Sequence, residues 1–459
     1  MAGLYIYGPS LPFPGIAVAT TVCLPLRVKA DMDVEAEQAA SGKTTMPSVS
    51  SRLSALCTKI RNLAARGTDT TVRRVGVDCI CIAMYNLGDA AARPAGTTTR
   101  MRSPRILSTV QFEEECVLGA CHNGDVVKVR HRVTGKTFAL KTVSLQFEEE
   151  EAVLALRVLR EACFMAACRG HPSLVGFHGV GRHPSTGRYC LIMEHVGPSL
   201  SDVLDSQRRS KPFPEHDVRR IIRQVLSAAK AMHDRGIVHR AINPANVFVG
   251  DSGNVVKIGN YGEATSVSET DVAYRTTMAY MAPEALLPAL CGDTELVDSW
   301  SIGCMMAELL TGEPLFALWD GDDDDDVAGQ LYKIFDVLGV PGKRTMRAIK
   351  MTRDPDARGI AEEVKQWRAR QRRVGKSRNS NRLGEVVHDD VLSDDGFEVL
   401  TGLLTCNPKK RLTAAAALQL PWFTDNDDSP APAVSQVGGP YVVAAVITLA
   451  VGVPVTMSA

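Results

Sequence analysis

The stretch HRAINPANVFV, residues 239–249, decides how this chain is interpreted. It follows a predicted amphipathic helix over Val218–Arg235, where apolar residues recur at helical spacing. A second polar turn, KIGNYG at residues 257–262, comes shortly after it. These two segments lie at the centre of a series of motifs suited to handling a phosphate group, and the other motifs lie on both sides.

A glycine-containing turn and a lysine precede this centre. The turn is LGACHNGDV at residues 118–126, where Gly119 and Gly124 would let backbone amides approach phosphate oxygens closely. The apolar strand FALK, residues 138–141, ends on Lys141, and Glu161 lies on a predicted helix over Glu148–Ala167. A buried lysine needs a carboxylate partner. We therefore expect Lys141 and Glu161 to pair and to direct the ammonium group at a dianionic group.

The periodicity of the chain predicts an α+β fold with two lobes. Strands and one helix come first, with a turn at Thr134 and Gly135; the strands are expected over Cys116–Leu118, Val126–Arg132, Thr137–Val143 and Tyr189–His195. From Leu200 onward the pattern is mainly helical, with further helices over Asp298–Thr311 and Gln330–Leu338. A small sheet lobe before a large helical lobe is an α+β arrangement, and the crevice between two such lobes is a natural ligand site.

The order and spacing of these motifs resemble the eukaryotic protein kinase fold over roughly residues 112–424. The segments APE at 282–284 and DSWSIG at 298–303 extend the match. The segments QLYKIFDVLGVP at 330–341 and PKKRL at 408–412 resemble cyclin-dependent kinases of the serine/threonine type. We expect an N-terminal extension over 1–110, largely disordered, a kinase-like domain over 111–424 and an uncharged tail over 425–459. The domain would divide into a small lobe, 111–196, and a large lobe, 197–424.

The resemblance implies roles for particular residues. It places Lys141, Glu161 and Asn246 in the catalytic centre, with Asn246 as a weak metal ligand. It implies that Asp298 braces the catalytic loop and that Glu284 and Arg411 form a buried ion pair. The residues expected to bind the nucleotide are Leu118, Gly119, Ala120, Cys121, Gly124, Val126, Ala139, Lys141, Glu194, Val196 and Phe248.

Three positions depart from the family pattern where the chemistry is carried. Ala241 replaces the Asp that receives or orients the proton of the substrate hydroxyl. Asn243 replaces a Lys that contacts the transferring phosphate, and Asn260 replaces the Asp that binds magnesium. A neutral amide is a much poorer magnesium ligand than a carboxylate. Cys121 also replaces the middle glycine of the phosphate loop.

These departures favour a pseudokinase that acts as a binding or scaffolding module, with weak ATP binding to which magnesium contributes little. The alternative is an active serine/threonine kinase that transfers the ATP γ-phosphate to protein hydroxyls, with Glu263 as the nearest replacement acid. A third interpretation is a translated remnant without a cellular role. The substitutions at Ala241 and Asn260 distinguish the pseudokinase from the active kinase, and a kinase assay would distinguish them directly.

The expected partner is a protein, as ligand or as substrate. Only Arg160 and Glu161 match the cyclin-reading helix motif, which puts cyclin binding in doubt. The position of the activating Thr falls on Val272, with Ser268 and Thr270 nearby. Lys+Arg and Asp+Glu both number 52 in the 459 residues, so the net charge is zero, which argues against bulk nucleic-acid binding.

The cysteines and the two ends of the chain allow fewer functional predictions. The 12 cysteines show no paired spacing of the zinc-finger kind and are interpreted as reduced. The first 30 residues contain no acid, and their prolines interrupt the apolar run, which leaves organelle targeting open in a protein otherwise expected in the cytoplasm or nucleus. The apolar segment Tyr441–Met457 is short, is broken by Gly452 and Pro454, and lacks basic anchors. We expect no stable membrane insertion.

Overall fold

The structure is a computed structural model. The residues that it describes are 107–121, 124–142, 151–183, 188–207, 212–267, 277–286, 294–317, 327–342, 344–345, 359, 362–366, 369 and 381–424. The predictions for the N-terminal extension, for Val272 with its neighbours and for the apolar tail fall outside these residues.

The small lobe is built on a six-stranded sheet with the order β1-β5-β6-β4-β3-β2. Only β1 pairs in parallel, with β5, and the other neighbours are antiparallel. Glycine at 135 closes the β3–β4 turn with a φ of 66°, a left-handed conformation that favours glycine. The strands are β1 (Leu107–Ser108), β2 (Phe112–Cys121), β3 (Gly124–His131), β4 (Thr137–Thr142), β5 (Phe177–Arg182) and β6 (Tyr189–Glu194).

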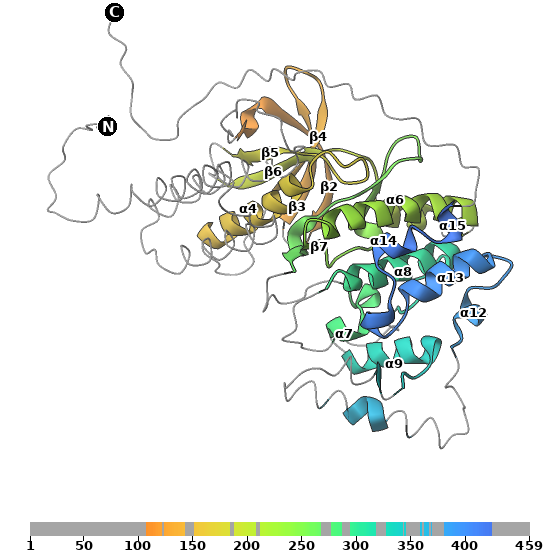
Figure 1. Cartoon of the computed structure of the whole chain (residues 1–459). Helices are drawn as coiled ribbons and strands as arrows, with labels where there is room; N and C mark the ends of the chain where they lie inside the picture. The colour runs from red at the N-terminus through yellow and green to blue at the C-terminus, as the bar shows by residue number, and fades with distance from the viewer. Residues whose placement is uncertain are drawn as a thin grey trace, which may run out of the picture.

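One long helix, α4 (Glu151–Ala167), packs against β5 and β6 of this sheet. Its second half is apolar, and the run from Ala162 to Ala167 is buried in the main core cluster. Figure 1 shows α4 crossing below the strands, on the side that faces the large lobe. The helix that carries Glu161 is thus held by apolar burial.

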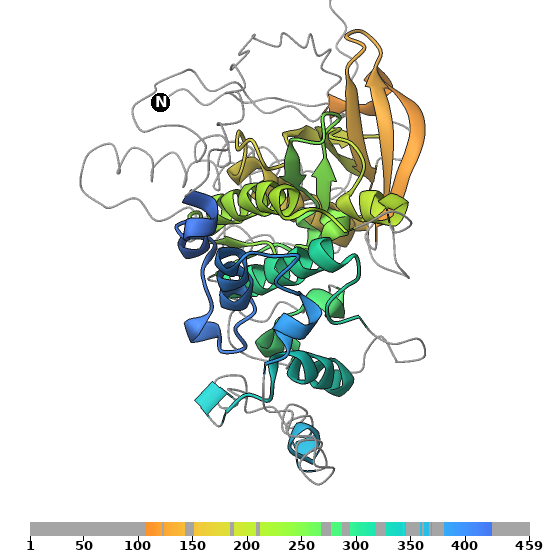
Figure 2. The same cartoon turned by 90° about the vertical axis from the view of Figure 1, so that its right-hand side faces the viewer.

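The large lobe is mainly helical, and its centre is α8, which is buried along nearly its whole length because almost every residue in it is apolar or small. Figures 1 and 2 both show α6 on the side of the small lobe and α9 on the opposite side of α8. The helices are α5 (Leu200–Gln207), α6 (Glu215–His233), α7 (Pro283–Leu286), α8 (Leu296–Thr311), α9 (Val327–Leu338), α12 (Leu383–Val386), α13 (Asp394–Leu403), α14 (Ala414–Ala417) and α15 (Pro421–Thr424).

Short strand pairs and single 3-10 turns occur in the segments between the longer elements. Strand β7 pairs with β10, and β8 pairs with β9, both antiparallel. Their bounds are β7 (Ile237–Val238), β8 (Val247–Val249), β9 (Val256–Ile258) and β10 (Thr265–Ser266). The 3-10 turns are η1 (Thr109–Gln111), η2 (Pro244–Asn246), η3 (Tyr261–Glu263), η4 (Met278–Tyr280) and η5 (Pro408–Lys410).

The predicted two-lobed α+β fold is confirmed, and the differences lie at the ends of elements. Strand β2 is longer than the predicted Cys116–Leu118, because two β-bulges keep it paired with β3 over ten residues. Helix α6 begins at Glu215 and ends at His233, whereas the apolar pattern predicted Val218–Arg235. Strand β5 was not predicted, since FHGVGR contains two glycines that weaken a strand pattern.

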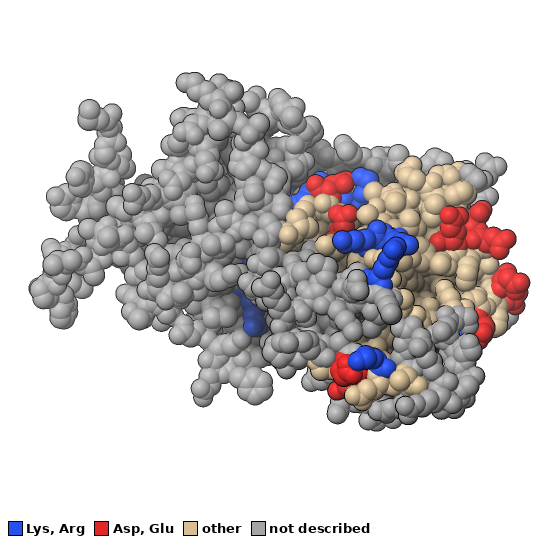
Figure 3. All heavy atoms as spheres, turned by 60° about the horizontal axis from the view of Figure 1, so that its bottom comes forward, with Lys and Arg blue, Asp and Glu red and all other residues tan. Residues whose placement is uncertain are grey.

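The described surface of the large lobe carries charges of both signs. On the face in Figure 3, acidic side chains gather toward one edge and basic ones lie nearer the middle, with uncharged residues between them. Within the described parts of the chain, no helix is both long and apolar enough to span a bilayer.

Candidate active site

The loop at 239–246 is fixed by one buried carboxylate. Asp298, at the start of α8, accepts hydrogen bonds from the backbone N–H of His239 at 2.8 Å and of Arg240 at 2.7 Å. His233 contacts the same carboxylate at 2.9 Å. Burial alone would raise the pKa of Asp298, but these hydrogen bonds and the nearby histidines lower it below its ordinary value. The predicted brace is confirmed.

This brace holds a strained backbone. Arg240 has a φ of 67°, and a long side chain in the left-handed region costs about 1–2 kcal/mol. Asn260 is also left-handed, with φ 59°, but short amide side chains tolerate that region better. Such residues persist only where the surrounding structure holds them, and they cluster at functional sites.

The imidazole of His239 links the two polar loops. Its Nε2 contacts the carbonyl oxygen of Gly259 at 3.0 Å, and its Nδ1 accepts from the N–H of Ala241 at 3.3 Å. One ring nitrogen therefore donates and the other accepts, which is the pattern of a neutral imidazole. Burial lowers the pKa of His239, and the charge of Asp298 opposes that effect only in part.

Lys141 and Glu161 pair as the sequence predicted. The Nζ of Lys141 donates to both carboxylate oxygens of Glu161 at 2.9 Å, and the two side chains are only 2% and 4% exposed. Lys141 lies on β4 and Glu161 on α4, so this contact joins the sheet to the helix. The ammonium is neutralised within the protein and still has donor capacity for one further group.

That further group is the amide of Asn260, which begins a chain of hydrogen bonds. Lys141 donates to Oδ1 of Asn260 at 2.8 Å. Nδ2 of Asn260 donates to Oδ1 of Asn246 at 2.8 Å, and Nδ2 of Asn246 donates to the carbonyl oxygen of Ala241 at 2.8 Å. Lysine is only a donor and a carbonyl only an acceptor, so the direction of both amides is determined from the two ends. We call Lys141, Asn260, Asn246 and the Ala241 carbonyl the amide relay.

Ala241 and Asn243 are buried, and neither offers an acidic group. Ala241 is 4% exposed and contributes a methyl group and a carbonyl that the amide relay already uses. Asn243 caps the turn η2, because its Oδ1 accepts from the N–H of Asn246 at 3.2 Å. Both positions are integrated into the loop by contacts within the chain.

The glycine-containing turn joins β2 to β3. Gly119 has open space around the position of a Cβ, and Leu118 beside it is 45% exposed. Ala120 and Cys121 end β2 opposite Asp125 and Gly124. The φ of 139° at Gly124 is one that residues with a side chain rarely adopt.

The expected nucleotide walls come from separate segments. Val126 on β3 pairs with Lys141 on β4, and Ala139 is 7% exposed. Val126, Val196 and Phe248 are partly buried and pack against the main core cluster that contains Ala139. Ala139 thus belongs to the apolar interior of the protein, and the other three residues border it.

Glu194 has a second role that the sequence did not indicate. Both of its carboxylate oxygens lie 2.8 Å from Nζ of Lys257, and Oε2 accepts from the N–H of Gly176 at 2.9 Å. Its side chain thus connects the end of β6 to β9 and to the segment before β5. Neither the periodicity nor the motifs of the sequence indicate this pair, because Glu194 and Lys257 are 63 residues apart.

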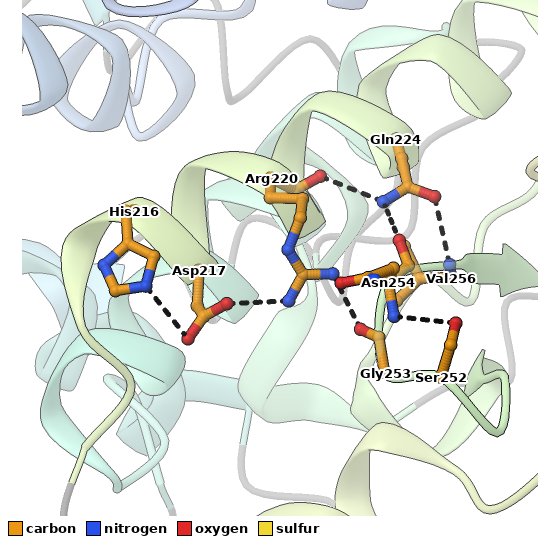
Figure 4. A network of polar contacts seen from close by, with 8 residues as sticks. All are labelled: His216, Asp217, Arg220, Gln224, Ser252, Gly253, Asn254 and Val256. Carbon is orange, nitrogen blue, oxygen red and sulfur yellow. Dashed lines mark hydrogen bonds and ion pairs between the residues drawn. The ribbon is translucent and has the colours of Figure 1, made fainter. Parts of the chain in front are cut away.

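The β8–β9 hairpin, which lies in the chain between Asn246 and Asn260 of the amide relay, is anchored to α6. Arg220 donates to the carbonyl of Gly253 at 2.7 Å and to Asp217 at 2.7 Å. Gln224 donates to the carbonyl of Asn254 at 2.9 Å and accepts from the N–H of Val256 at 3.1 Å (Figure 4). Two side chains one helical turn apart therefore hold the tip and the second strand of the hairpin.

The predicted pair in the large-lobe frame is also formed. Arg411 donates to Glu284 from both terminal nitrogens, at 2.6 and 2.9 Å, and its guanidinium side chain is fully buried. It also donates to the carbonyls of Thr405 and Leu296. This bidentate pair ties α7 to the C-terminal part of the domain.

Comparison with known proteins agrees with this architecture. The model of the family described as protein kinase domain matches residues 112–423. The chain is 38% identical over 335 residues to the protein named "Putative cyclin-dependent kinase F-2" of Oryza sativa subsp. japonica, covering 69% of this chain and 91% of that protein. It is 34% identical to cell division control protein 2 homolog 3 of Trypanosoma brucei brucei, covering 67% of this chain and 90% of that protein.

A third relative is longer. Cyclin-dependent kinase G1 of Arabidopsis thaliana is 33% identical over 307 residues, which are 65% of this chain and 47% of that protein. The match to the kinase domain covers well over half of this chain. The chain belongs to the protein kinase family and is cyclin-dependent-kinase-like.

Proposed function

We propose that this chain is a cyclin-dependent-kinase-like pseudokinase, a binding or scaffolding module for a protein partner that retains weak ATP binding. The observation that carries the proposal is the amide relay. Positions 241 and 260, which carry acids in the family pattern, hold a methyl group and an amide. The Ala241 carbonyl and Nδ2 of Asn260 are both hydrogen-bonded to Asn246, and Oδ1 of Asn260 accepts from Lys141.

The loss at Ala241 removes the group that would receive the proton of a hydroxyl. A missing general base costs about 10²–10⁴ in rate. The Ala241 carbonyl cannot replace it, because a carbonyl is a poor proton acceptor and this one already binds Asn246. The hydroxyl of a serine or threonine substrate would therefore find no proton acceptor at position 241.

The residues do not fit the magnesium ion that the family implies. Mg²⁺ prefers carboxylate oxygens in octahedral geometry, and Asn260 supplies only an amide oxygen that faces the ammonium of Lys141. Oδ1 of Asn246 accepts from Asn260. Among the described residues, no group of three or more His, Cys, Asp or Glu side chains could hold a metal.

A phosphotransfer assay on the full-length protein tests the main proposal. We expect transfer from ATP to protein acceptors at background level. The triple variant Ala241→Asp/Asn243→Lys/Asn260→Asp should gain measurable activity, while each single repair should gain little, because the three groups act on one transition state. The triple variant with Lys141→Met added is the matched control and should return to background.

The alternative is an active serine/threonine kinase, and the assembled Lys141–Glu161 pair favours it. Glu263 on η3 is then the candidate replacement acid. Robust turnover by the native chain, abolished by Lys141→Met and by Glu263→Gln, would refute the pseudokinase and establish this alternative. If neither the native chain nor the triple variant transfers phosphate, the cause of the lost activity lies outside these three positions.

Nucleotide binding is the second measurable consequence. We expect calorimetry to detect weak ATP binding that changes less than about threefold when magnesium is replaced by a chelator, because the amide relay supplies no carboxylate. Lys141→Met should weaken it further. Tight binding that vanishes with the chelator would contradict the interpretation of Asn260.

A further inference from the structure

The sheet of the small lobe has two faces, and α4 lies on one of them. Lys141 on β4 points to the side of α4, where it pairs with Glu161. Successive side chains on a strand point to opposite faces, so Leu140 lies on the other side of the sheet. We call that side the outer face. Its apolar floor is a cluster separate from the main core, formed by Val129, Leu140 and Cys190 with Phe112, Val127 and Phe138 packed against it.

The apolar surface of the outer face continues to residues that are well exposed. Cross-strand pairing places Val117 of β2 beside Val127, and Val127 beside Leu140, so these three share the outer face. Leu140 is 5% exposed, whereas Val117 is 71% exposed. Two further exposed valines, Val110 and Val133, lie in the turn before β2 and in the turn after β3. Exposed apolar side chains that adjoin a buried apolar floor are typical of a docking surface.

The chain enters the described part of the molecule at the far edge of this sheet. Strand β1 pairs in parallel with β5, and a Cβ added at Gly179 would lie 3.6 Å from Cδ1 of Leu107. Gly179 pairs with Ile192, and Ile192 pairs with Leu140, so Leu107 approaches the sheet from the outer face. The residues before Leu107 are therefore tethered at an edge of the outer face.

Within those preceding residues, which lie outside the described part of the structure, residues 53–65 have the pattern of an amphipathic helix. Thr58 and Asn62 would lie on its polar side, and Gly67 follows shortly, as is typical of a helix end. A helix of this length is marginal in water by itself, so it needs an apolar surface to pack on. Its apolar side is formed, at helical spacing, by Leu53, Leu56, Cys57, Ile60, Leu63 and Ala64.

We propose that residues 53–65 dock as this helix on the outer face of the small-lobe sheet, with their apolar side against Val117, Val127 and Phe138. A helix of that length is about 20 Å long, and a six-stranded sheet is about 24 Å wide, so the two match in size. As a flexible chain, residues 66–106 span about 35 Å, which is enough to reach any point of the face. The tether makes the contact intramolecular, so a weak affinity keeps it occupied.

Hydrogen exchange of the full-length protein, measured by mass spectrometry on peptides from residues 51–67, tests the docking. We expect exchange there to be about tenfold faster in Leu56→Glu/Ile60→Glu than in the native chain, because two charges then lie on the apolar side. Thr58→Glu/Asn62→Glu is the matched control, since it adds the same charges at the same spacing on the polar side, and it should exchange as the native chain does. Equal exchange in the native chain and in Leu56→Glu/Ile60→Glu would overturn the inference.

A substitution on the sheet tests the face itself. Val117→Glu should also speed exchange in residues 53–65 about tenfold. Because Val117 is mainly exposed, peptides from β3 and β4 should keep their native exchange. Val386→Glu, the same change at an exposed valine of α12, is the control and should have no effect on residues 53–65. Slow exchange of residues 53–65 that survives Val117→Glu would overturn the assignment to the outer face.

Other occupants give different results. Docking within one chain predicts slow exchange of residues 53–65 in a monomer, as measured by sedimentation, at low and at high protein concentration. Slow exchange found only in a dimer would assign the face to a second copy, and slow exchange found only with phosphatidylserine vesicles would assign the helix to a membrane surface; either result overturns the inference. None of these measurements depends on ATP binding or phosphotransfer, so the inference is tested separately from the proposed function.

Discussion

Two regions of the molecule differ in the kind of hydrogen-bond partner that their polar side chains have. Around Asp298 and Arg411, buried charged side chains hold the protein's own groups: two backbone N–H groups and His233 in the first case, Glu284 and two carbonyls in the second. In the amide relay, the side chains that would hold substrate or metal are a methyl group and amides bonded within the chain. Asp298, Glu284 and Arg411, whose partners are internal, match the family pattern. Ala241, Asn243 and Asn260, at positions whose family partners are substrate or metal, do not.

The difference follows from what each substitution costs. Removing an internal partner leaves a buried polar group without a hydrogen bond, which costs about 1–3 kcal/mol per group. Replacing a side chain whose partner would be a substrate or metal costs little stability if the new side chain forms hydrogen bonds within the chain. Asn243 does so by capping η2. A fold can thus persist while its reaction chemistry is lost.

The largest effect is expected from Asp298→Ala, which breaks the frame. It would leave the N–H groups of His239 and Arg240 and the ring of His233 without their acceptor. We expect a loss of about 3–6 kcal/mol in the free energy of unfolding, or no folded protein, measured by urea denaturation. Asp336→Ala, which removes a partly exposed partner of Arg382, is the control and should cost under about 1 kcal/mol. Equal losses would show that the buried carboxylate of Asp298 contributes no more to stability than a partly exposed ion pair.

The next effect comes from the pair of Arg411 and Glu284. Glu284→Gln removes one charge beside a fully buried guanidinium, and we expect a loss of about 3–5 kcal/mol by denaturant titration. The double variant Glu284→Gln/Arg411→Met should cost clearly less than the sum of the single variants, because the uncompensated charge is then gone. Additive losses would show that the two side chains act independently.

A smaller effect is expected from pH, through His239. Burial lowers its pKa, so below about pH 6.5 the unfolded chain binds a proton that the folded chain does not. Stability therefore falls as pH falls, by about 1.4 kcal/mol per pH unit for such a group. Denaturation between pH 7.5 and 5.5 measures the slope, to which His171, His178 and His195 add in the same direction because burial lowers their pKa as well. Stability that is flat or rises toward pH 5.5 would contradict the buried neutral imidazole.

Much of the site could be predicted because its parts lie in short motifs. The pairing of Lys141 with Glu161 follows from a lysine in an apolar strand and an acid on a helix, since a buried ammonium requires a carboxylate. The contact of Glu284 with Arg411 spans 127 residues and was predictable only through the resemblance of the surrounding segments. No local pattern in either segment indicates its partner.

The amide relay and the packing at Gly259 could not be predicted in the same way. Asn246 and Asn260 were singled out one by one, but the direction of their hydrogen bonds depends on Lys141 at one end and the Ala241 carbonyl at the other. Gly259 stands in the sequence as a small residue between Ile258 and Asn260. A Cβ at this position would lie 2.9 Å from Cε2 of Phe248 on the neighbouring strand.

The sequence by itself determined the fold class from its periodicity. Through the resemblance of its motifs to protein kinases, it also indicated the substituted positions 241, 243 and 260 and the pairs Lys141–Glu161 and Glu284–Arg411. Only the tertiary structure decided how the substituted residues are satisfied, that Glu194 is engaged by Lys257, and that residue 259 must lack a side chain. Hydrogen-bond direction and steric exclusion depend on distances between segments far apart in the chain. Periodicity and motif spacing carry no information about such distances.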